Sequence, residues 1–188
     1  MITGIIMASG FSNRMGKDKL LIDVNGKKII ERVIEAAKYS KLDEVILIYR
    51  TEEVRYIGET YKIKTIYNPS AHLGQSQSVI IGVESSEEGT YMFFIGDQPF
   101  ISVGLIDLLI DKYNKESEKI IVPYYENMIG MPIIFPSSLR EELLRIWGDK
   151  GGGEIIRNNP LLIKKVYIDD EYLIKDIDTV EDYERWCK

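Results

Sequence analysis

The sequence predicts an α/β fold in which helices cover a mostly parallel sheet. Apolar, β-branched runs alternate along the chain with segments whose apolar residues recur at helical spacing, which is the pattern of such a sheet. The 188 residues are enough for one well-packed core, and fractions of 45% hydrophobic and 29% charged residues are typical of a soluble globular protein. We therefore expect a single domain that spans residues 1–188.

Seven apolar runs predict the strands, in chain order. They are Thr3–Ala8, Glu44–Arg50, Lys64–Tyr67, Tyr91–Gly96, Lys119–Pro123, Met131–Phe135 and Ile163–Ile168. Apolar residues recur at helical spacing within 30–37, 79–83, 105–112 and 139–147, and Ser137 is the expected N-cap of the last of these helices. The stretch GDKGGGEIIRNNP, residues 148–160, is expected to form a mobile loop that leads into a short helix. A final helix is expected over Val180–Trp186.

Charge and cysteine content narrow the class of protein. The chain has 24 Lys and Arg against 30 Asp and Glu, a net charge of −6, so its surface should repel nucleic acid and anionic lipid. The opening MITGIIMA is apolar but far shorter than the roughly 20 residues of a membrane span. The single Cys187 excludes a disulfide framework and a cysteine-rich metal site. We expect a cytoplasmic protein with neither membrane nor nucleic acid as a partner.

The stretch MASGFSNRMGKDK, residues 7–19, forms a basic glycine loop after the first strand. Ligands of open α/β sheets bind at this carboxyl end of the strands. Gly10 and Gly16 allow the backbone to expose amide N–H groups, and Arg14 and Lys19 beside them suit a triphosphate. Five residues separate the two glycines, so the loop is not a Walker A motif, and the dinucleotide fingerprint is absent too. A solvated basic turn between strand and helix is the alternative.

Two acidic positions are candidates for a metal site. The strand in YMFFIGDQP delivers Asp97 to the same sheet edge as the basic loop, and Mg²⁺ is usually held by one or two carboxylates plus phosphate oxygens. A simple turn at Asp97 is the alternative. Asp178, after the last strand, is either a second metal ligand or a helix cap, because Asp178 or Thr179 can cap the final helix and Thr179 with Asp182 resembles a capping box.

Together, MASGFSNRMGKDK, GDQP and DIDTVEDY resemble the nucleotidyltransferases of the GT-A-like fold, within them the molybdenum cofactor cytidylyltransferase group. That group's loop reads roughly A-A-G-x-S-x-R-M-G-x-x-K. The residues that match it are Gly10, Ser12, Arg14, Met15, Gly16 and Lys19. LGQSQSVIIG, GMPIIF and GDKGGG resemble further blocks of the family, in the family's order. The resemblance implies a three-layer α/β sandwich with a mostly parallel, Rossmann-like sheet.

The resemblance also implies a reaction. A nucleoside monophosphate, CMP from CTP, is transferred to a molybdopterin-type phosphate acceptor with release of pyrophosphate and with Mg²⁺ as cofactor, and a molybdoenzyme is a possible client. The implied catalytic residues are Arg14 on the outgoing phosphates, Lys19 at the α-phosphate and Asp97, which holds the metal together with Asp178. The implied nucleotide-binding residues are Ala8, Ser9, Gly10, Ser12, Arg14, Met15, Gly16, Lys19, Gly74, Gln75 and Ser78.

Departures from the family pattern leave alternatives open. Ser9 stands where the loop has a second Ala, and guanine-transferring members carry Gly-Gly where this chain has Ser9-Gly10. Gly152 and Gly153 stand where the family tends to have Ala-Arg, and Arg157 comes later. The alternatives are a GTP-using guanylyltransferase, a sugar-1-phosphate nucleotidyltransferase of the same fold, and a catalytically silent nucleotide-binding chaperone.

Overall fold

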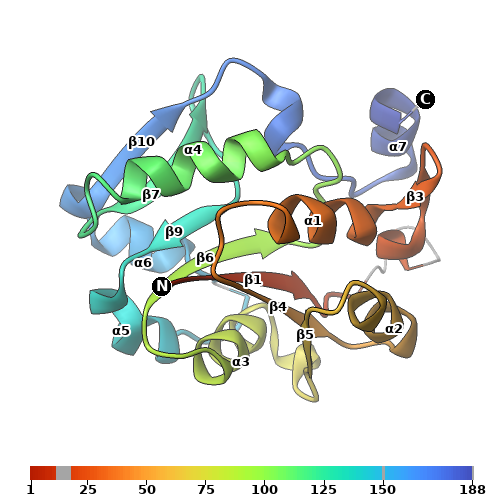
Figure 1. Cartoon of the computed structure of the whole chain (residues 1–188), viewed down its shortest axis with the longest axis horizontal. Helices are drawn as coiled ribbons and strands as arrows, with labels where there is room; N and C mark the ends of the chain where they lie inside the picture. The colour runs from red at the N-terminus through yellow and green to blue at the C-terminus, as the bar shows by residue number, and fades with distance from the viewer. Residues whose placement is uncertain (12–17, 150, 188) are drawn as a thin grey trace.

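A computed structural model describes residues 1–11, 18–149 and 151–187. Within these ranges, a central sheet runs in the order β10-β7-β9-β6-β1-β4-β5 (Figure 1). The short strand β8 pairs with the C-terminal end of β7. Its strands are β1 (Ile2–Ala8), β4 (Glu44–Tyr49), β5 (Lys64–Tyr67), β6 (Thr90–Ile95), β7 (Ile120–Tyr125), β8 (Met128–Ile129), β9 (Ile133–Phe135) and β10 (Ile163–Tyr167). A small separate hairpin joins β2 (Asp23–Val24) to β3 (Lys27–Lys28).

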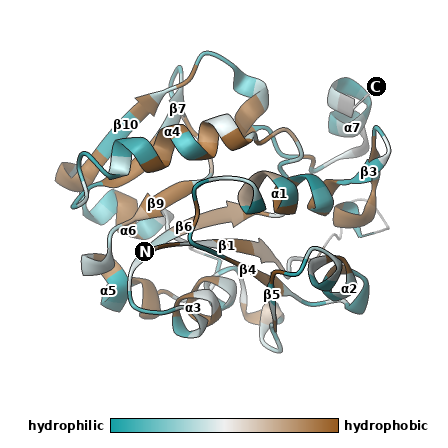
Figure 2. Cartoon of the chain, viewed as in Figure 1, coloured by the Kyte–Doolittle hydropathy of each residue, from teal (hydrophilic) through white to brown (hydrophobic). Residues whose placement is uncertain are grey.

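Helices cover both faces of the sheet, which confirms the predicted α/β sandwich. One face carries α1 (Ile29–Lys38), α2 (Glu52–Thr60) and α4 (Val103–Tyr113). The other carries α3 (Ser76–Ser85), α5 (Arg140–Leu144) and α6 (Gly153–Asn158), while α7 (Val180–Cys187) lies beside the β2–β3 hairpin. Figure 2 shows the apolar strands between helices whose outer faces are polar. None of the helices in the described part of the chain is long and apolar enough to cross a membrane.

Strand β1 lies at the centre of the sheet and pairs in parallel with β4 on one side and β6 on the other. Because side chains alternate along a strand, Ile5 and Ile6 enter the two opposite cores, and both are fully buried. A strand covered on both faces needs a continuous apolar run, which the sequence provides. Both β1 and β6 end at the same edge, and the polar residues that follow them therefore meet there.

The seven predicted strands are all present, with ends that match or differ by one or two residues. Helix α2 and the β2–β3 hairpin are not among the elements that the sequence predicts, and three further details of the strands and helix caps differ from that prediction. Strand β9 runs antiparallel to β6 and β7, and β7 continues into β8 through a hairpin that the sequence analysis missed. Ser137 is not an N-cap, because it is the first residue of a 3₁₀ helix (Ser137–Leu139) that Pro136 precedes without a side-chain cap.

Two side chains assigned to apolar helical faces are exposed instead of buried. The α5 helix ends at Leu144, so Trp147 lies beyond it and 68% of the residue is accessible to solvent. Leu108 lies on the outer side of α4 and is 48% exposed, while Leu105 and Leu109 are buried as predicted. Spacing alone places Leu108 next to the buried stripe, and only the position of the sheet decides which edge of the stripe faces water.

Candidate functional site

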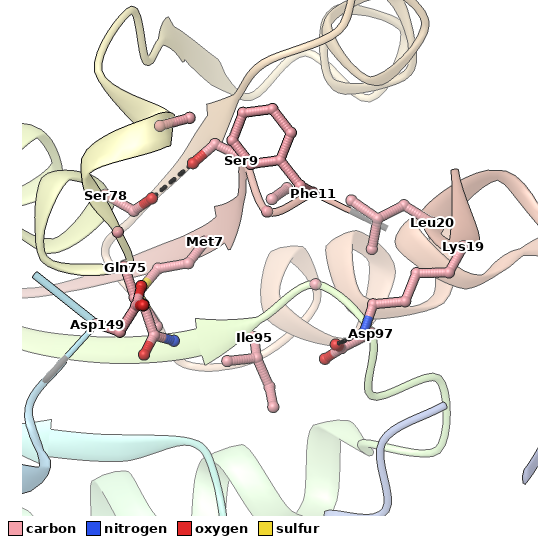
Figure 3. Close-up of a pocket in the computed structure, with 15 residues that line it drawn as sticks. Met7, Ser9, Phe11, Lys19, Leu20, Gln75, Ser78, Ile95, Asp97 and Asp149 are labelled. Carbon is pink, nitrogen blue, oxygen red and sulfur yellow. Dashed lines mark hydrogen bonds and ion pairs between the residues drawn. The ribbon is translucent and has the colours of Figure 1, made fainter. Parts of the chain in front are cut away.

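A cavity of about 430 Å³ lies at the edge of the sheet where β1 and β6 end. Figure 3 shows side chains that surround it from the end of β1, the first turn of α3 and the end of β6, together with Lys19, Leu20 and Asp149. Its lining residues are Met7, Ala8, Ser9, Gly10, Phe11, Lys19, Leu20, Ala71, Gly74, Gln75, Ser78, Ile95, Gly96, Asp97 and Asp149. The cavity at the carboxyl ends of parallel strands is therefore the candidate binding site, at the place where ligands of open α/β sheets bind.

Lys19 brings two carboxylates together at one end of this cavity. It begins a 3₁₀ helix (Lys19–Leu21) that Asp18 caps by accepting a hydrogen bond from the Leu20 backbone N–H. Lys19 Nζ lies 2.5 Å from Asp97 Oδ2 and donates a hydrogen bond of 2.6 Å to Asp178 Oδ1. The Lys19 and Asp97 side chains are only 18% and 16% exposed. Asp178 is 41% exposed, so the ion-pair network has a buried part at Lys19 and Asp97 and a solvent-facing part at Asp178.

Burial and charge act in opposite directions on this network. Burial alone lowers the pKa of Lys19, but the charges and hydrogen bonds of Asp97 and Asp178 outweigh it, so the pKa is raised and the ammonium stays protonated. Burial, followed by the charge of Asp97, raises the pKa of the neighbouring Asp176. Asp97 Oδ1 is buried and has no hydrogen-bond partner among the described residues. A buried carboxylate oxygen without a partner is a position at which a cation or a ligand donor is expected.

The segment before α7 crosses the end of β6 and carries Asp178 into the site. The Ile177 backbone N–H donates a hydrogen bond of 3.0 Å to the Asp97 carbonyl oxygen. Ile177 is fully buried in a small cluster with Val24 and Ile29. Gln98 makes a second hydrogen bond to this segment, in which its Nε2 donates to the Ile174 carbonyl oxygen at 2.8 Å. These contacts hold the C-terminal segment against the cavity.

The sequence left open whether Asp178 or Thr179 caps the final helix, and the structure shows that Thr179 does. Asp182 N donates to Thr179 Oγ1 at 3.1 Å, and Thr179 N donates to Asp182 Oδ2 at 2.9 Å. This reciprocal pair is a capping box, so Thr179 is the residue that caps α7 through its side chain. Asp178 Oδ1 instead accepts the hydrogen bond from Lys19.

Ser9 and Ser78 form a buried polar group at the other end of the cavity, joined by a hydrogen bond of 2.7 Å between their Oγ atoms (Figure 3). Asn68 Nδ2 donates to Ser9 Oγ at 2.9 Å and to Ser78 Oγ at 3.3 Å, and Ser70 N donates to Asn68 Oδ1 at 3.0 Å. Asn68 is 1% exposed. Sequence reasoning missed this residue, although Asn68-Pro69 directly follows the strand β5 at the same sheet edge.

A second cavity of about 560 Å³ adjoins the first. The two share Met7, Gln75 and Asp149. The other lining residues of the second cavity are Val79, Phe93, Ile129, Met131, Ile133, Phe135, Gly151, Gly152, Gly153, Ile156 and Arg157. Its walls are therefore mostly apolar. Arg157 is the cation among these lining residues, and within the described part of the chain it makes no ion pair.

Glycines allow Gly148 to lie close to the first turn of α3 and Gly152 to lie close to Phe135 of β9. Gly74 has a φ of 104°, and a Cβ there would lie 2.5 Å from the Gly148 backbone carbon. Ser76 N donates to the Gly148 carbonyl oxygen at 3.0 Å across this approach. A Cβ at Gly152 would lie 2.7 Å from Phe135 Cζ. Side chains at either position would prevent these close approaches, which explains the small residues.

The sequence matches the family of the MobA-like NTP transferase domain over residues 4–164. The chain belongs to the MobA-like NTP transferase family. This MobA-like chain is 28% identical over 196 residues to the purine catabolism protein PucB of Bacillus subtilis, with 97% of the chain and 94% of that protein covered. It is 32% identical over 136 residues to a probable molybdenum cofactor guanylyltransferase of Natranaerobius thermophilus, with 69% of the chain and 65% of that protein covered.

Solved structures of other proteins share the fold of this MobA-like chain. A nucleotidyl transferase from Methanothermobacter superimposes with a TM-score of 0.85 at 21% identity, and the match covers 100% of this chain and 96% of that one. The predicted enzyme class, nucleotidyltransferase, is therefore confirmed at the level of the family. The predicted preference for CTP stays a prediction, since the molybdenum cofactor relatives carry the name guanylyltransferase.

The structure brings together most of the residues predicted for the site. Those that line the first cavity are Ala8, Ser9, Gly10, Lys19, Gly74, Gln75, Ser78 and Asp97. Asp178 reaches the same place through Lys19. Ser12, Arg14, Met15 and Gly16 lie outside the described residues, so their roles in phosphate binding stay predictions. No three His, Cys, Asp or Glu side chains in ranges 1–11, 18–149 and 151–187 gather into a ready-made metal cage.

Proposed function

We propose that the protein transfers CMP from CTP to a molybdopterin-type phosphate acceptor and releases pyrophosphate. The observation that carries the proposal is the network of Lys19, Asp97 and Asp178 at one end of a cavity whose other end holds Ser9 and Ser78. Cationic and metal-binding groups at one end suit phosphates, and a small polar pocket at the other end suits a nucleoside. The membership in the MobA-like family supports the same reaction class.

Mg²⁺ fits the carboxylates of this site. Asp97 Oδ1 is buried without a hydrogen-bond partner within the described residues, and carboxylate oxygens are the ligands that Mg²⁺ prefers. Two carboxylates with phosphate oxygens from the nucleotide suffice, so a cage of three protein ligands is not required. Asp97 and Asp178 would hold the ion, which neutralises the negative charge that phosphate oxygens carry during transfer.

The side chains of the chain itself position the substrates and stabilise charge. A phosphate monoester is largely ionised at neutral pH, so its attack on the α-phosphate needs little from a general base. Among the described residues that line the first cavity there is neither histidine nor cysteine, so the proposed reaction is a direct transfer to the acceptor phosphate. The ammonium of Lys19 stays protonated beside the carboxylates and is available to the phosphate that is transferred.

The second cavity is the proposed site of the acceptor. It shares the lining residues Met7, Gln75 and Asp149 with the first cavity, so an acceptor held there would lie beside the nucleotide. Its apolar walls suit a ring system, and the exposed Arg157 suits an anionic group at the rim. Arg157 thus provides a cation near the position at which the family tends to have one.

The buried serine pair supports a pyrimidine over guanine. One of the two hydroxyl protons is used in the bond between Ser9 and Ser78, and Asn68 Nδ2 donates to both oxygens. One hydroxyl proton remains for an acceptor atom of the ligand, which cytosine and guanine both offer, so the proposed preference for the smaller pyrimidine rests on the space that the Ser9 side chain occupies. GTP is the second candidate, because relatives are named molybdenum cofactor guanylyltransferase.

The test is an assay of pyrophosphate release with each of the four NTPs, with molybdopterin or a sugar 1-phosphate as acceptor. We expect release with molybdopterin and a kcat/KM for CTP at least about tenfold above that for GTP, within the range of ~10–200-fold that pocket shape provides. Better use of GTP overturns the cytidylyl assignment only. Release with the sugar phosphate alone overturns the acceptor, and nucleotide binding without release with either acceptor supports a silent binding protein.

A further inference from the structure

The ammonium of Lys19 occupies the place at which two carboxylates converge. Nζ lies 2.5 Å from Asp97 Oδ2 and 2.6 Å from Asp178 Oδ1, so both oxygens lie within hydrogen-bonding distance of one atom. The three side chains come from separate parts of the chain: the 3₁₀ helix at residue 19, the end of β6 and the segment before α7. Figure 3 shows Lys19 extended across this end of the cavity toward Asp97.

These contacts compete with a metal ion. A divalent cation held by Asp97 and Asp178 would share these carboxylates with the ammonium, which contacts Asp97 Oδ2 and Asp178 Oδ1 and leaves Asp97 Oδ1 without a partner among the described residues. An ammonium and a divalent cation on one pair of carboxylates also repel each other, and the low exposure of Lys19 and Asp97 limits the screening of this repulsion by water. Lys19 in its present position therefore opposes metal binding.

We propose that Lys19 is an internal counter-ion, which holds the carboxylates of Asp97 and Asp178 until a triphosphate arrives with a divalent cation and then moves to the phosphates. The idea rests on the proposed function for the identity of the incoming ligands. A triphosphate brings its own negative charge into the cavity that Lys19 lines, so the ammonium exchanges one set of anionic partners for another. The long, flexible lysine stem allows this movement without a change in the backbone.

Two consequences follow for binding. Without nucleotide, a metal ion must displace Lys19 into a cavity that offers it no phosphate, so the metal alone binds weakly. With nucleotide, Lys19 gains partners when it moves, so metal and triphosphate strengthen each other's binding. The ammonium also prevents the repulsion between Asp97 and Asp178 in the protein without substrate.

The experiment titrates the full-length protein with Mn²⁺ in the absence of nucleotide at pH 8, and free Mn²⁺ is measured by electron paramagnetic resonance. Lys19→Met keeps the length of the stem and removes the charge. We expect this variant to bind one Mn²⁺ at least tenfold more tightly than the parent. Lys19→Arg keeps a cation and should bind Mn²⁺ as weakly as the parent. Equal affinities of the parent and Lys19→Met overturn the proposal.

A double variant, Lys19→Met with Asp97→Asn, tests whether the gain arises at this site. We expect the gain in Mn²⁺ affinity to disappear, and a gain that persists overturns the proposal. Circular dichroism and thermal melting verify that each variant is folded, and Mn²⁺ should raise the melting temperature of Lys19→Met more than that of the parent. If Lys19→Met does not fold, Lys19→Gln replaces it in the same titration.

The titration is independent of turnover. Tighter Mn²⁺ binding by Lys19→Met supports the counter-ion role even if the parent releases no pyrophosphate from any NTP, in which case the proposed function alone fails. Unchanged Mn²⁺ binding overturns the counter-ion role even if the parent is fully active. The two hypotheses therefore fail through different measurements.

Discussion

The backbone N–H of Ile177 donates a hydrogen bond to the carbonyl oxygen of Asp97, across 80 positions of the sequence, with a length of 3.0 Å. This contact fixes the C-terminal segment against the end of β6, and the Ile177 side chain anchors it in a small core with Val24 and Ile29. Tyr183 makes a further, exposed hydrogen bond, in which its Oη donates to the Asp23 carbonyl oxygen at 2.9 Å. The position of Asp178 thus depends on packing outside the cavity.

We predict that Ile177→Ala lowers both stability and activity. Truncation of a fully buried Ile costs about 2–5 kcal/mol in the free energy of unfolding, and loss of the anchor should displace Asp178 from Lys19. The measurements are urea unfolding and turnover below the melting transition. Ile46→Ala is the control, since Ile46 is equally buried in the core on the other face of the sheet. The interpretation fails if both folded variants retain equal activity.

Asp97→Asn should abolish turnover and leave the fold intact. The change removes the carboxylate charge with little change in volume, and electrostatic stabilisation by a bound metal is worth several kcal/mol in a transition state. Initial rates at saturating Mg²⁺ check the prediction. Asp111→Asn is the matched control, because Asp111 pairs with Lys41 on the surface and should be dispensable. An Asp97→Asn rate within a factor of two of the parent rate would exclude the metal role.

Ser9→Gly should narrow the difference between CTP and GTP. Removal of the side chain enlarges the pocket and breaks the hydrogen bond with Ser78, so shape discrimination, which is worth ~10–200-fold, should fall. Stability should also fall by about 0.5–1.5 kcal/mol, since Asn68 loses one of its two hydroxyl partners. Parallel kcat/KM values for the two nucleotides test this. Ser40→Gly, at a half-buried hydroxyl outside the cavity, should leave the nucleotide ratio unchanged.

The pH dependence of stability should change with Glu35→Gln. The hydrogen bond from Lys27 lowers the pKa of Glu35 below its usual value; burial opposes this effect, and the hydrogen bond from Tyr61 adds to it. A lowered folded-state pKa stabilises the protein above the unfolded-state pKa, and the contribution disappears as pH falls through the folded-state value. We expect Glu35→Gln to lose roughly 0.2–1 kcal/mol at pH 7 and nothing below the lowered pKa. Denaturant unfolding across this pH range checks the sign.

Part of the architecture follows from local pattern. The run Ile5-Ile6-Met7-Ala8 and the run that precedes Asp97 are each long enough and apolar enough to form a buried strand, whatever their neighbours are. Parallel strands end at one edge of the sheet, so the sequence alone predicts that the basic loop and Asp97 face the same cavity. The capping box of Thr179 and Asp182 is local in the same sense, because it needs only four consecutive positions.

Other features depend on pairings that no local pattern contains. Lys19 and Asp178 are 159 positions apart, and Ser9 and Ser78 are 69 apart, so their contacts exist only after the sheet order and the path of the C-terminal segment are set. The antiparallel direction of β9 likewise depends on its pairing with β6, which lies far from it in the sequence. Apolar periodicity determines which segments form strands and helices, whereas tertiary packing selects their neighbours. Tertiary packing, and not apolar periodicity, therefore places Asn68 between two serines and Lys19 between two carboxylates.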